Sequence, residues 1–207
     1  MSLLAVLDFL GVALFAATGA LSASRKQLDL IGFLFLGTLT GIGGGTVRDL
    51  IIGVPVFWVE RPAYLLVCVG TAVLVHFGAH LVEYRWRLLI WLDAAALAAY
   101  GVFGAAKGLA TTGEPAVAIV MGMMTATLGG ILRDMVAGEP SVLLRREIYV
   151  TAALFGAAAF VALDALGLPR PLPAALGFLA AFGLRAGAIG FGWALPPYRG
   201  RPGRDIR

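Results

Sequence analysis

One glycine-rich motif occurs twice in this chain, and the two copies lie 85 positions apart. Residues 41–49 read GIGGGTVRD and residues 127–134 read TLGGILRD. The same spacing, without a gap, pairs further identical residues: Asp8 with Asp93, Gly53 with Gly138, Pro55 with Pro140 and Tyr64 with Tyr149. So many identities at one spacing indicate an internal duplication. The sequence therefore divides into a first three-helix repeat (1–85), a second three-helix repeat (86–170), a seventh spanning segment (171–195) and a basic tail (196–207).

The apolar runs of the chain are long enough to cross a lipid bilayer. Of the 207 residues, 60% are apolar and only 14% are charged, whereas a soluble domain averages about 25% charged residues. A helix needs about 20 apolar residues to span a bilayer. Seven segments meet this condition, near 3–23, 29–53, 62–82, 88–107, 115–138, 148–166 and 172–195. The sequence predicts an all-α polytopic membrane protein with seven transmembrane helices.

The basic residues predict the orientation of these helices. Each repeat holds three spans, so the second copy enters the membrane from the opposite side, which makes an inverted 3+3 repeat plus one helix. The loops on the side of the C-terminus carry most of the Lys and Arg residues, and the other side carries only Arg61, Lys107 and Arg170. Because Lys and Arg concentrate in cytoplasmic loops, we expect a cell (inner) membrane protein with the N-terminus outside and the C-terminus cytoplasmic. The net charge of +4 then reflects topology and contact with membrane lipids, and no nucleic-acid partner is expected.

The second and fifth spans contain the glycine motifs and are expected to be broken or kinked there, because consecutive glycines weaken a helix. One interpretation is close helix packing through small residues. The other is an ion or substrate pathway near the membrane midplane, and the equivalent positions of the two breaks favour it. Threonine hydroxyls beside the glycines either bond to the carbonyl one turn back or line a pore. The candidate pore residues are Gly43, Gly44, Gly45, Thr46, Thr125, Thr127, Gly129 and Gly130.

Charged residues inside the predicted spans form a second set of candidates, since ionisable groups are costly at membrane depth and mark functional sites. We expect the first acid of each repeat to pair with the arginine of the motif, Asp8 with Arg48 and Asp93 with Arg133. Asp49 and Asp134 would then be uncompensated or shared acids, one near each end of a pore, and would favour cations over anions. The alternative is a structural Arg–Asp clamp that holds each broken helix to its neighbour.

Arg185 and a pair of histidines are two further candidate sites. Arg185 lies near the middle of the seventh span, where it either holds that helix to the repeats or lies in a water-filled path and opposes cations. His76 and His80 are four residues apart, a spacing that can bind a metal, but no third ligand is identifiable, so no metal or cofactor is expected. The sequence has no nucleophile–base arrangement, cysteine cluster or phosphate-binding loop, and an enzyme is therefore not expected.

These residues resemble the prokaryotic branch of the trimeric intracellular cation channel (TRIC) family. The resemblance rests on both glycine motifs with their Arg-Asp pairs, and it covers nearly the whole chain through Leu7-Asp8, Thr18–Leu21, Pro55–Trp58, Arg185 and Phe191–Pro196. It implies a seven-helix protomer, a homotrimer, and one pore in each protomer bounded by kinked second and fifth helices. Leu128 stands where the first copy has Gly43, so the two kinks are not equivalent.

The resemblance also implies a passive channel for monovalent cations, which are potassium and sodium, with potassium preferred. The alternative is a secondary transporter of a small solute such as an amino acid, because inverted repeats with broken helices serve alternating access equally well.

Overall fold

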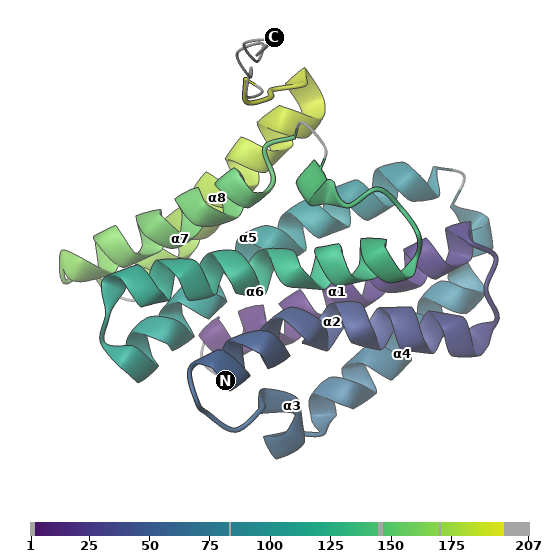
Figure 1. Ribbon diagram of the computed structural model, residues 1–207, viewed down its shortest axis with the longest axis horizontal. Coiled ribbons are helices and arrows are strands. Elements are labelled where there is room, and N and C mark those ends of the chain that lie inside the picture. The colour runs from purple at the N-terminus through teal and green to yellow at the C-terminus, as the bar shows by residue number, and fades with distance from the viewer. Residues whose placement is uncertain (1–2, 83, 145–146, 170, 197–207) are drawn as a thin grey trace, which may run out of the picture.

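The computed structural model describes residues 3–82, 84–144, 147–169 and 171–196, and within these ranges the chain is helical and has no strand (Figure 1). The predicted basic tail lies outside the described residues beyond Pro196. The helices are α1 (Leu3–Arg25), α2 (Leu30–Ile51), α3 (Phe57–Glu60), α4 (Ala63–Gly78), η1 (Ala79–Leu81), α5 (Arg85–Thr112), α6 (Pro115–Val136), η2 (Val142–Leu144), α7 (Val150–Ala165) and α8 (Pro171–Phe191).

The long helices make this a polytopic membrane protein. Five described helical segments are long and apolar enough to cross a bilayer: α2, α4 with η1, α5, α6 and α8. Helix α7 is apolar but has 16 residues, and α1 has 23. The bounds of two predicted spans differ clearly from the structure. Helix α5 starts at Arg85 and continues to Thr112, where Gly113 ends it with a φ of 72°, and α8 ends at Phe191 before Gly192 with a φ of 70°.

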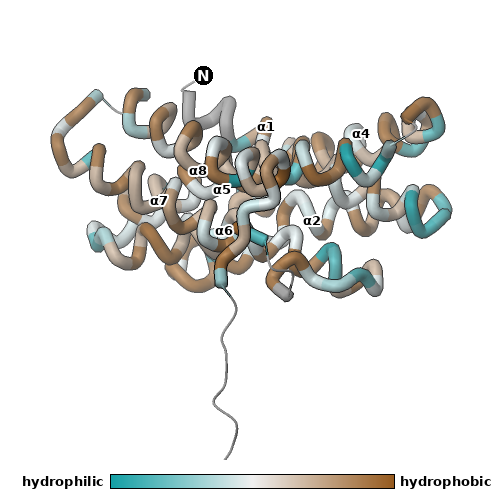
Figure 2. Tube along the Cα trace, turned by 90° about the horizontal axis from the view of Figure 1, so that it is seen from above, coloured by the Kyte–Doolittle hydropathy of each residue, from teal (hydrophilic) through white to brown (hydrophobic). Residues whose placement is uncertain are grey.

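Helix α5 occupies the centre of the protein. It packs against α1, α6, α7 and α8, and 67% of its most apolar stretch is buried, compared with 44% for α2 and α6. In Figure 1, α2 and α6 lie side by side, the α7–α8 pair forms one end, and α4 lies on the far side of α2 from α6. Figure 2 shows that apolar residues follow most of the length of the helices. Large apolar side chains on α4, such as Leu66, Leu74 and Phe77, are exposed, as expected for a helix that faces lipid.

Small residues allow close packing of α1 on α2, and the same contact recurs between α5 and α6. A Cβ atom on Gly19 of α1 would lie 2.5 Å from Thr40 Oγ1 of α2. A Cβ atom on Gly104 of α5 would lie 2.6 Å from Thr125 Oγ1 of α6. Both residues of the second contact stand 85 positions after those of the first. A larger side chain at either glycine would push the two helices apart.

The chain turns back after α2 and after α6 in the same manner. Gly53 has a φ of 70° and Gly138 a φ of 63°, in the left-handed region that only glycine adopts readily. In each turn a loop amide donates to a carbonyl of the helix end, that of Asp49 at 3.0 Å or that of Asp134 at 2.9 Å. Such bonds close the C-terminus of a helix. The turns bring α3 and η2 back against the helix ends that carry the charged motifs.

Candidate functional site

Helices α2 and α6 cross at the glycine motifs with their backbones in contact. A Cβ atom on Gly44 would overlap the carbonyl oxygen of Thr125, and one on Gly129 would lie 2.6 Å from the carbonyl oxygen of Thr40. Both helices are uninterrupted over all of their 22 residues. The predicted break is therefore wrong, and the packing interpretation holds at this crossing, because glycine allows two backbones to touch. A bend at these glycines stays a prediction.

The other glycines of the two motifs make room for side chains. A Cβ atom on Gly45 would lie 2.7 Å from the ring of Phe57, and one on Gly130 would lie 2.5 Å from the hydroxyl oxygen of Tyr149. Gly43 faces Leu132 of α6, at 2.9 Å. The glycines therefore determine how closely the aromatic side chains approach the crossing.

The candidate threonines donate hydrogen bonds within their own helices. The hydroxyl groups of Thr46, Thr125 and Thr127 donate to the carbonyl oxygen four residues earlier, at 2.7, 2.5 and 2.9 Å. Thr46 Oγ1 also accepts a hydrogen bond from the indole of Trp58 at 2.9 Å. The sequence left two roles open for these hydroxyls, a hydrogen bond to the carbonyl one turn earlier or the lining of a pore. The structure contains the hydrogen bond.

Replacement of Thr125 by valine is therefore expected to have a small effect on stability. Valine has the same shape, and the lost hydroxyl bonds a carbonyl that already belongs to the helix, so the free energy of unfolding should change by about 1 kcal/mol or less. Denaturation in graded sodium dodecyl sulfate, followed by circular dichroism, measures this change. A loss above about 2 kcal/mol would mean that the hydroxyl bonds a group outside its own helix.

Asp49 lies at the centre of the first charge cluster. Its Oδ1 accepts a hydrogen bond from Arg48 Nε at 2.8 Å and forms ion pairs with Arg48 Nη2 and Lys107 Nζ, both at 2.8 Å. Its Oδ2 accepts from the amide of Phe57 at 2.9 Å. Asp49 and Arg48 are fully buried, whereas the Lys107 side chain is 26% exposed. The cluster ties α2 to α3 and α5.

Arg133 lies at the centre of the second charge cluster. Its Nη1 donates to Asp93 Oδ1 at 2.7 Å and to Thr18 Oγ1 at 3.0 Å, and its Nε and Nη2 donate to Asp134 Oδ1 at 3.0 and 2.9 Å. Asp134 Oδ2 accepts from the amide of Val142 at 3.0 Å. All three charged side chains are buried. Two acids thus share one arginine, and the cluster ties α6 to α1, α5 and η2.

The predicted pair of Asp93 with Arg133 is present, but the predicted pair of Asp8 with Arg48 is wrong. The Arg48 guanidinium turns to Asp49 and lies 5.2 Å from the centre of the Phe103 ring. Asp8 instead accepts a hydrogen bond from the hydroxyl of Tyr64. Its other oxygen, Oδ1, is buried and has no hydrogen-bond partner among the described residues.

The prediction that Asp49 and Asp134 are uncompensated or shared acids holds only in part. Asp49 is not uncompensated, because Arg48 and Lys107 both contact it. Asp134 is a shared acid, since it contacts the same Arg133 as Asp93. The alternative of a structural clamp describes the contacts of both aspartates, whose second oxygens hold the start of α3 and of η2.

Sequence reasoning missed Lys107 and Tyr64 as members of these clusters. Lys107 stands at the end of a predicted span and was counted as a loop charge, but α5 continues past it to Thr112. Tyr64 aligns with Tyr149 in the duplication, and that identity was the available signal. Both tyrosines are buried, Tyr64 against Asp8 and Tyr149 against the second cluster.

Two of the pockets beside the charge clusters are each lined by the first acid of a repeat, Asp8 or Asp93. The Asp8 pocket, about 190 Å³, is lined by Asp8, Phe57, Glu60, Arg61, Tyr64, Phe103 and Lys107. The Asp93 pocket, only about 10 Å³, is lined by Trp86, Leu89, Ile90, Asp93, Arg133, Val142, Glu147 and Arg185. Asp93 and Val142 stand 85 positions after Asp8 and Phe57. The two pockets are therefore built partly from equivalent residues of the two copies.

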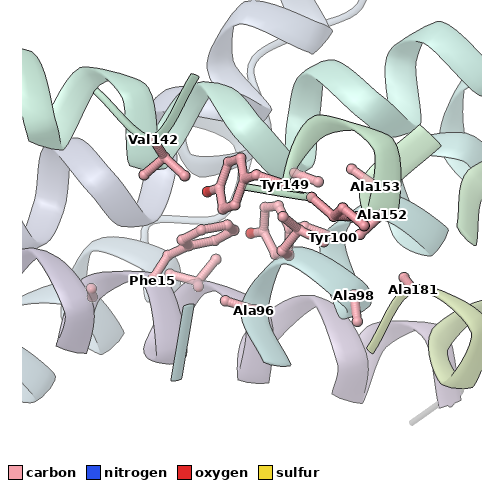
Figure 3. Close-up of a cluster of buried hydrophobic side chains, with 14 of the residues drawn as sticks. Phe15, Ala96, Ala98, Tyr100, Val142, Tyr149, Ala152, Ala153 and Ala181 are labelled. Atoms are coloured by element: carbon pink, nitrogen blue, oxygen red, sulfur yellow. The ribbon is translucent and has the colours of Figure 1, made fainter. Parts of the chain in front are cut away.

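An aromatic cluster lies between the residues that line the Asp8 pocket and those that line the Asp93 pocket. Figure 3 shows the rings of Phe15, Tyr100 and Tyr149 together, with Phe15 in edge contact with Tyr100 at 5.4 Å between ring centres. All three are buried, and the hydroxyls of Tyr100 and Tyr149 have no hydrogen-bond partner among the described residues. A buried hydroxyl without a partner is costly unless water or an ion reaches it. The rings of the cluster are therefore apolar, but its two hydroxyl oxygens lack a hydrogen-bond partner among the described residues.

Arg185 of α8 reaches the Asp93 pocket. Its Nη2 forms an ion pair with Glu147 Oε2 at 2.7 Å, and its Nη1 donates to the carbonyl oxygen of Ile148 at 3.3 Å. The guanidinium lies 5.2 Å from the centre of the Tyr149 ring, and Nε has no partner among the described residues. Arg185 thus contacts the repeats through an acid and a carbonyl, and it lines a pocket as well.

Comparison with known proteins places the chain in a family. A family model described as "Glycine transporter" matches twice, over residues 5–80 and 90–165. The UPF0126 inner membrane protein YadS of Escherichia coli K12 is 36% identical over 198 residues, which cover 93% of this chain and 94% of that protein. The TRIC orthologue from Rhodobacter sphaeroides is 55% identical and superposes with a TM-score of 0.91, covering 93% of this chain and all of that one. The chain belongs to the TRIC family.

A second TRIC structure agrees with this assignment. A prokaryotic TRIC channel solved in 0.5 M KCl is 26% identical, has a TM-score of 0.85, and matches 93% of this chain and 98% of its own. The two matches of the family model start 85 positions apart, the spacing that the sequence motifs have. The family model and the solved TRIC structures carry different functional descriptions, a transporter and a channel.

Proposed function

We propose that this protein is a channel for monovalent cations, with potassium preferred, and that each protomer of a homotrimer has its own pore. The observation that carries the proposal is the 55% identity and the TM-score of 0.91 with the TRIC channel orthologue of Rhodobacter sphaeroides, over 93% of this chain. At that similarity we expect the path for ions to be preserved.

The proposed membrane arrangement has seven spans, as an inverted 3+3 repeat plus α8, with the N-terminus outside. Contacts between helix ends support the alternating direction of the spans. Lys107 near the end of α5 pairs with Asp49 near the end of α2, and Arg25 at the end of α1 lies 4.4 Å from the ring of Trp86 at the start of α5. If the chain crosses the membrane at every long helix, each of these contacts joins two ends on the same side.

The proposed path runs from the Asp8 pocket, past the aromatic cluster, to the Asp93 pocket. Buried polar atoms without a partner follow it: Asp8 Oδ1, the hydroxyls of Tyr100 and Tyr149, and Arg185 Nε. Each such atom is costly in a dry interior; water can satisfy all of them, and a cation can satisfy the carboxylate and hydroxyl oxygens. The path thus lies beside the α2–α6 crossing and not through it, because the backbones touch there.

The charges along this path support a preference for cations. Asp93 and Asp134 share Arg133, so the second cluster has one more acid than base. Asp8 forms no ion pair with a described residue, and it faces the pocket that Glu60 also lines. Buried negative charge lowers the energy of a cation and raises that of an anion. Arg61 and Lys107, which line the same pocket, and Arg48 oppose this effect near Asp8, and Asp49 lies between Arg48 and Lys107.

The state described here is closed in this proposal. Phe15, Tyr100 and Tyr149 are each at most 1% exposed, so opening requires these rings to move apart. Gly129 and Gly130 lie where Phe15 and Tyr149 approach α6. A small shift or bend of α6 at these glycines would therefore move the helix surface against which the Phe15 and Tyr149 rings pack.

Recording from the purified protein in a planar lipid bilayer tests the proposal. We expect unitary current steps and reversal potentials that follow potassium and sodium gradients and not a chloride gradient. The alternative, a secondary transporter of a small solute, is supported by the description of the family model. Uptake of labelled glycine into vesicles without unitary steps would favour that alternative, because a carrier moves too few ions per second to give such steps.

A further inference from the structure

The two pockets are unequal, although equivalent residues line parts of both. The Asp8 pocket has about 190 Å³ and the Asp93 pocket about 10 Å³, which is close to the least volume that holds one water molecule. The Asp93 pocket contains a side chain that has no counterpart on the other side. That side chain is Arg185, from α8, which lies outside the duplicated segments 5–80 and 90–165.

The surroundings of the Arg185 guanidinium are those of a cation site. Glu147 lies 2.7 Å away, the carbonyl oxygen of Ile148 lies 3.3 Å away, and the face of the Tyr149 ring lies within 5.2 Å. Asp93 lines the same pocket. A carboxylate, a carbonyl oxygen and an aromatic face are groups that attract a cation.

The guanidinium is buried, with a side chain 3% exposed, but its acidic partner is open to water and ions. The Glu147 side chain is 40% exposed, so water screens the ion pair. The bond to Ile148 is long, at 3.3 Å, and Nε has no partner among the described residues. A permeant cation that enters the pocket would meet the same ligands and would compete with Arg185 for them.

A purely structural role is not needed to attach α8. Helix α8 already packs tightly on α7 through small residues, since a Cβ atom on Gly156 would lie 2.5 Å from Ala181 Cβ and one on Gly177 would lie 3.0 Å from the carbonyl oxygen of Gly156. A buried arginine with one unused nitrogen adds little to such an interface.

We infer that Arg185 is a tethered cation that occupies the Asp93 pocket and competes there with the ions that the channel conducts. The inference rests on the proposed channel function and assigns a conductance-limiting residue to it. Arg185 raises the barrier at one end of the path only, so it also makes the current depend on the direction of flow.

Bilayer recording in symmetric potassium chloride tests this with Arg185→Gln and Arg185→Lys. We expect Arg185→Gln to raise the unitary potassium conductance about threefold or more and to reduce rectification, because the fixed positive charge is gone. Arg185→Lys keeps the charge but not the planar guanidinium, so it should change the conductance less than Arg185→Gln does. Size-exclusion chromatography shows whether each variant assembles. A folded Arg185→Gln variant with unchanged conductance and rectification overturns the inference.

Glu147→Gln provides a second test if Arg185→Gln does not assemble. It leaves the guanidinium in place without its counter-charge, so conductance should fall about threefold or more, beyond the small effect expected from a screened surface charge. A change below about 1.5-fold overturns the inference. Absence of unitary steps from the unaltered protein would instead overturn the proposed channel function, so the two failures are distinguishable.

Discussion

Replacement of Gly44 by alanine is expected to destabilise the protein by about 3 kcal/mol or more, one of the largest effects of any single methyl group in this chain. The added Cβ would overlap the carbonyl oxygen of Thr125. A backbone carbonyl cannot rotate away as a side chain does, so α2 and α6 must separate along their crossing. Denaturation in graded sodium dodecyl sulfate, followed by circular dichroism, measures the loss.

Gly70→Ala is the matched control for this variant. Gly70 also lies inside a spanning helix, α4, but a Cβ atom there would meet nothing within 4 Å. Alanine favours the helix over glycine by about 1 kcal/mol, so this variant should be as stable as the unaltered protein or slightly more so. Equal effects at Gly44 and Gly70 would show that helix propensity, and not the close crossing, governs both positions.

The sequence predicted the helices well because membrane spans depend on local composition. Five of the seven predicted runs correspond to described helices that are long and apolar enough to cross a bilayer, and the ends of α5 and α8 differ only by a few residues. The ends could not be placed exactly from hydropathy, because α5 continues through Lys107. That lysine is stabilised by Asp49 of another helix, a contact that no local pattern records.

The glycine motifs show what the sequence could not decide. The same two glycines, Gly44 and Gly129, suit either a broken helix or a close crossing, because both need the absence of a side chain. Only the position of the other helix's backbone distinguishes a broken helix from a close crossing. The carbonyl oxygens of Thr125 and Thr40 occupy the space in question, so the two helices stay intact at their crossing, and the proposed path lies beside it.

Of the two ion pairs that the sequence predicts, only one is present, for a related reason. Adjacent residues on a helix point in different directions, so Arg48 and Asp49 were not expected to meet. The arginine side chain is long enough to turn back, and Phe103 lies beside the turned guanidinium. The residue equivalent to Phe103 at the second cluster is Thr18, which comes from the first copy and accepts a hydrogen bond from Arg133. This difference and the presence of Lys107 in the first cluster only change what each arginine contributes.

Replacement of Arg133 by glutamine is expected to destabilise the protein by about 3–5 kcal/mol, because it leaves buried acids without their counter-charge. Arg133 contacts both Asp93 and Asp134, and the structure shows no other ion pair of a described residue with either of them. Glutamine keeps part of the side-chain length and a donor but has no charge. Unfolding in graded sodium dodecyl sulfate, with circular dichroism as the signal, measures the loss.

Arg48→Gln is the matched variant in the first copy, and its effect should be smaller, about 1–2 kcal/mol. Asp49 would keep the ion pair with Lys107 at 2.8 Å and the amide of Phe57 at 2.9 Å, so no buried acid is left alone. Adding Asp93→Asn to Arg133→Gln removes one of the two orphaned charges and should recover about half of the lost stability. Equal losses for Arg48→Gln and Arg133→Gln would mean that Lys107 does not neutralise Asp49, and that the two clusters differ in sequence without differing in charge balance.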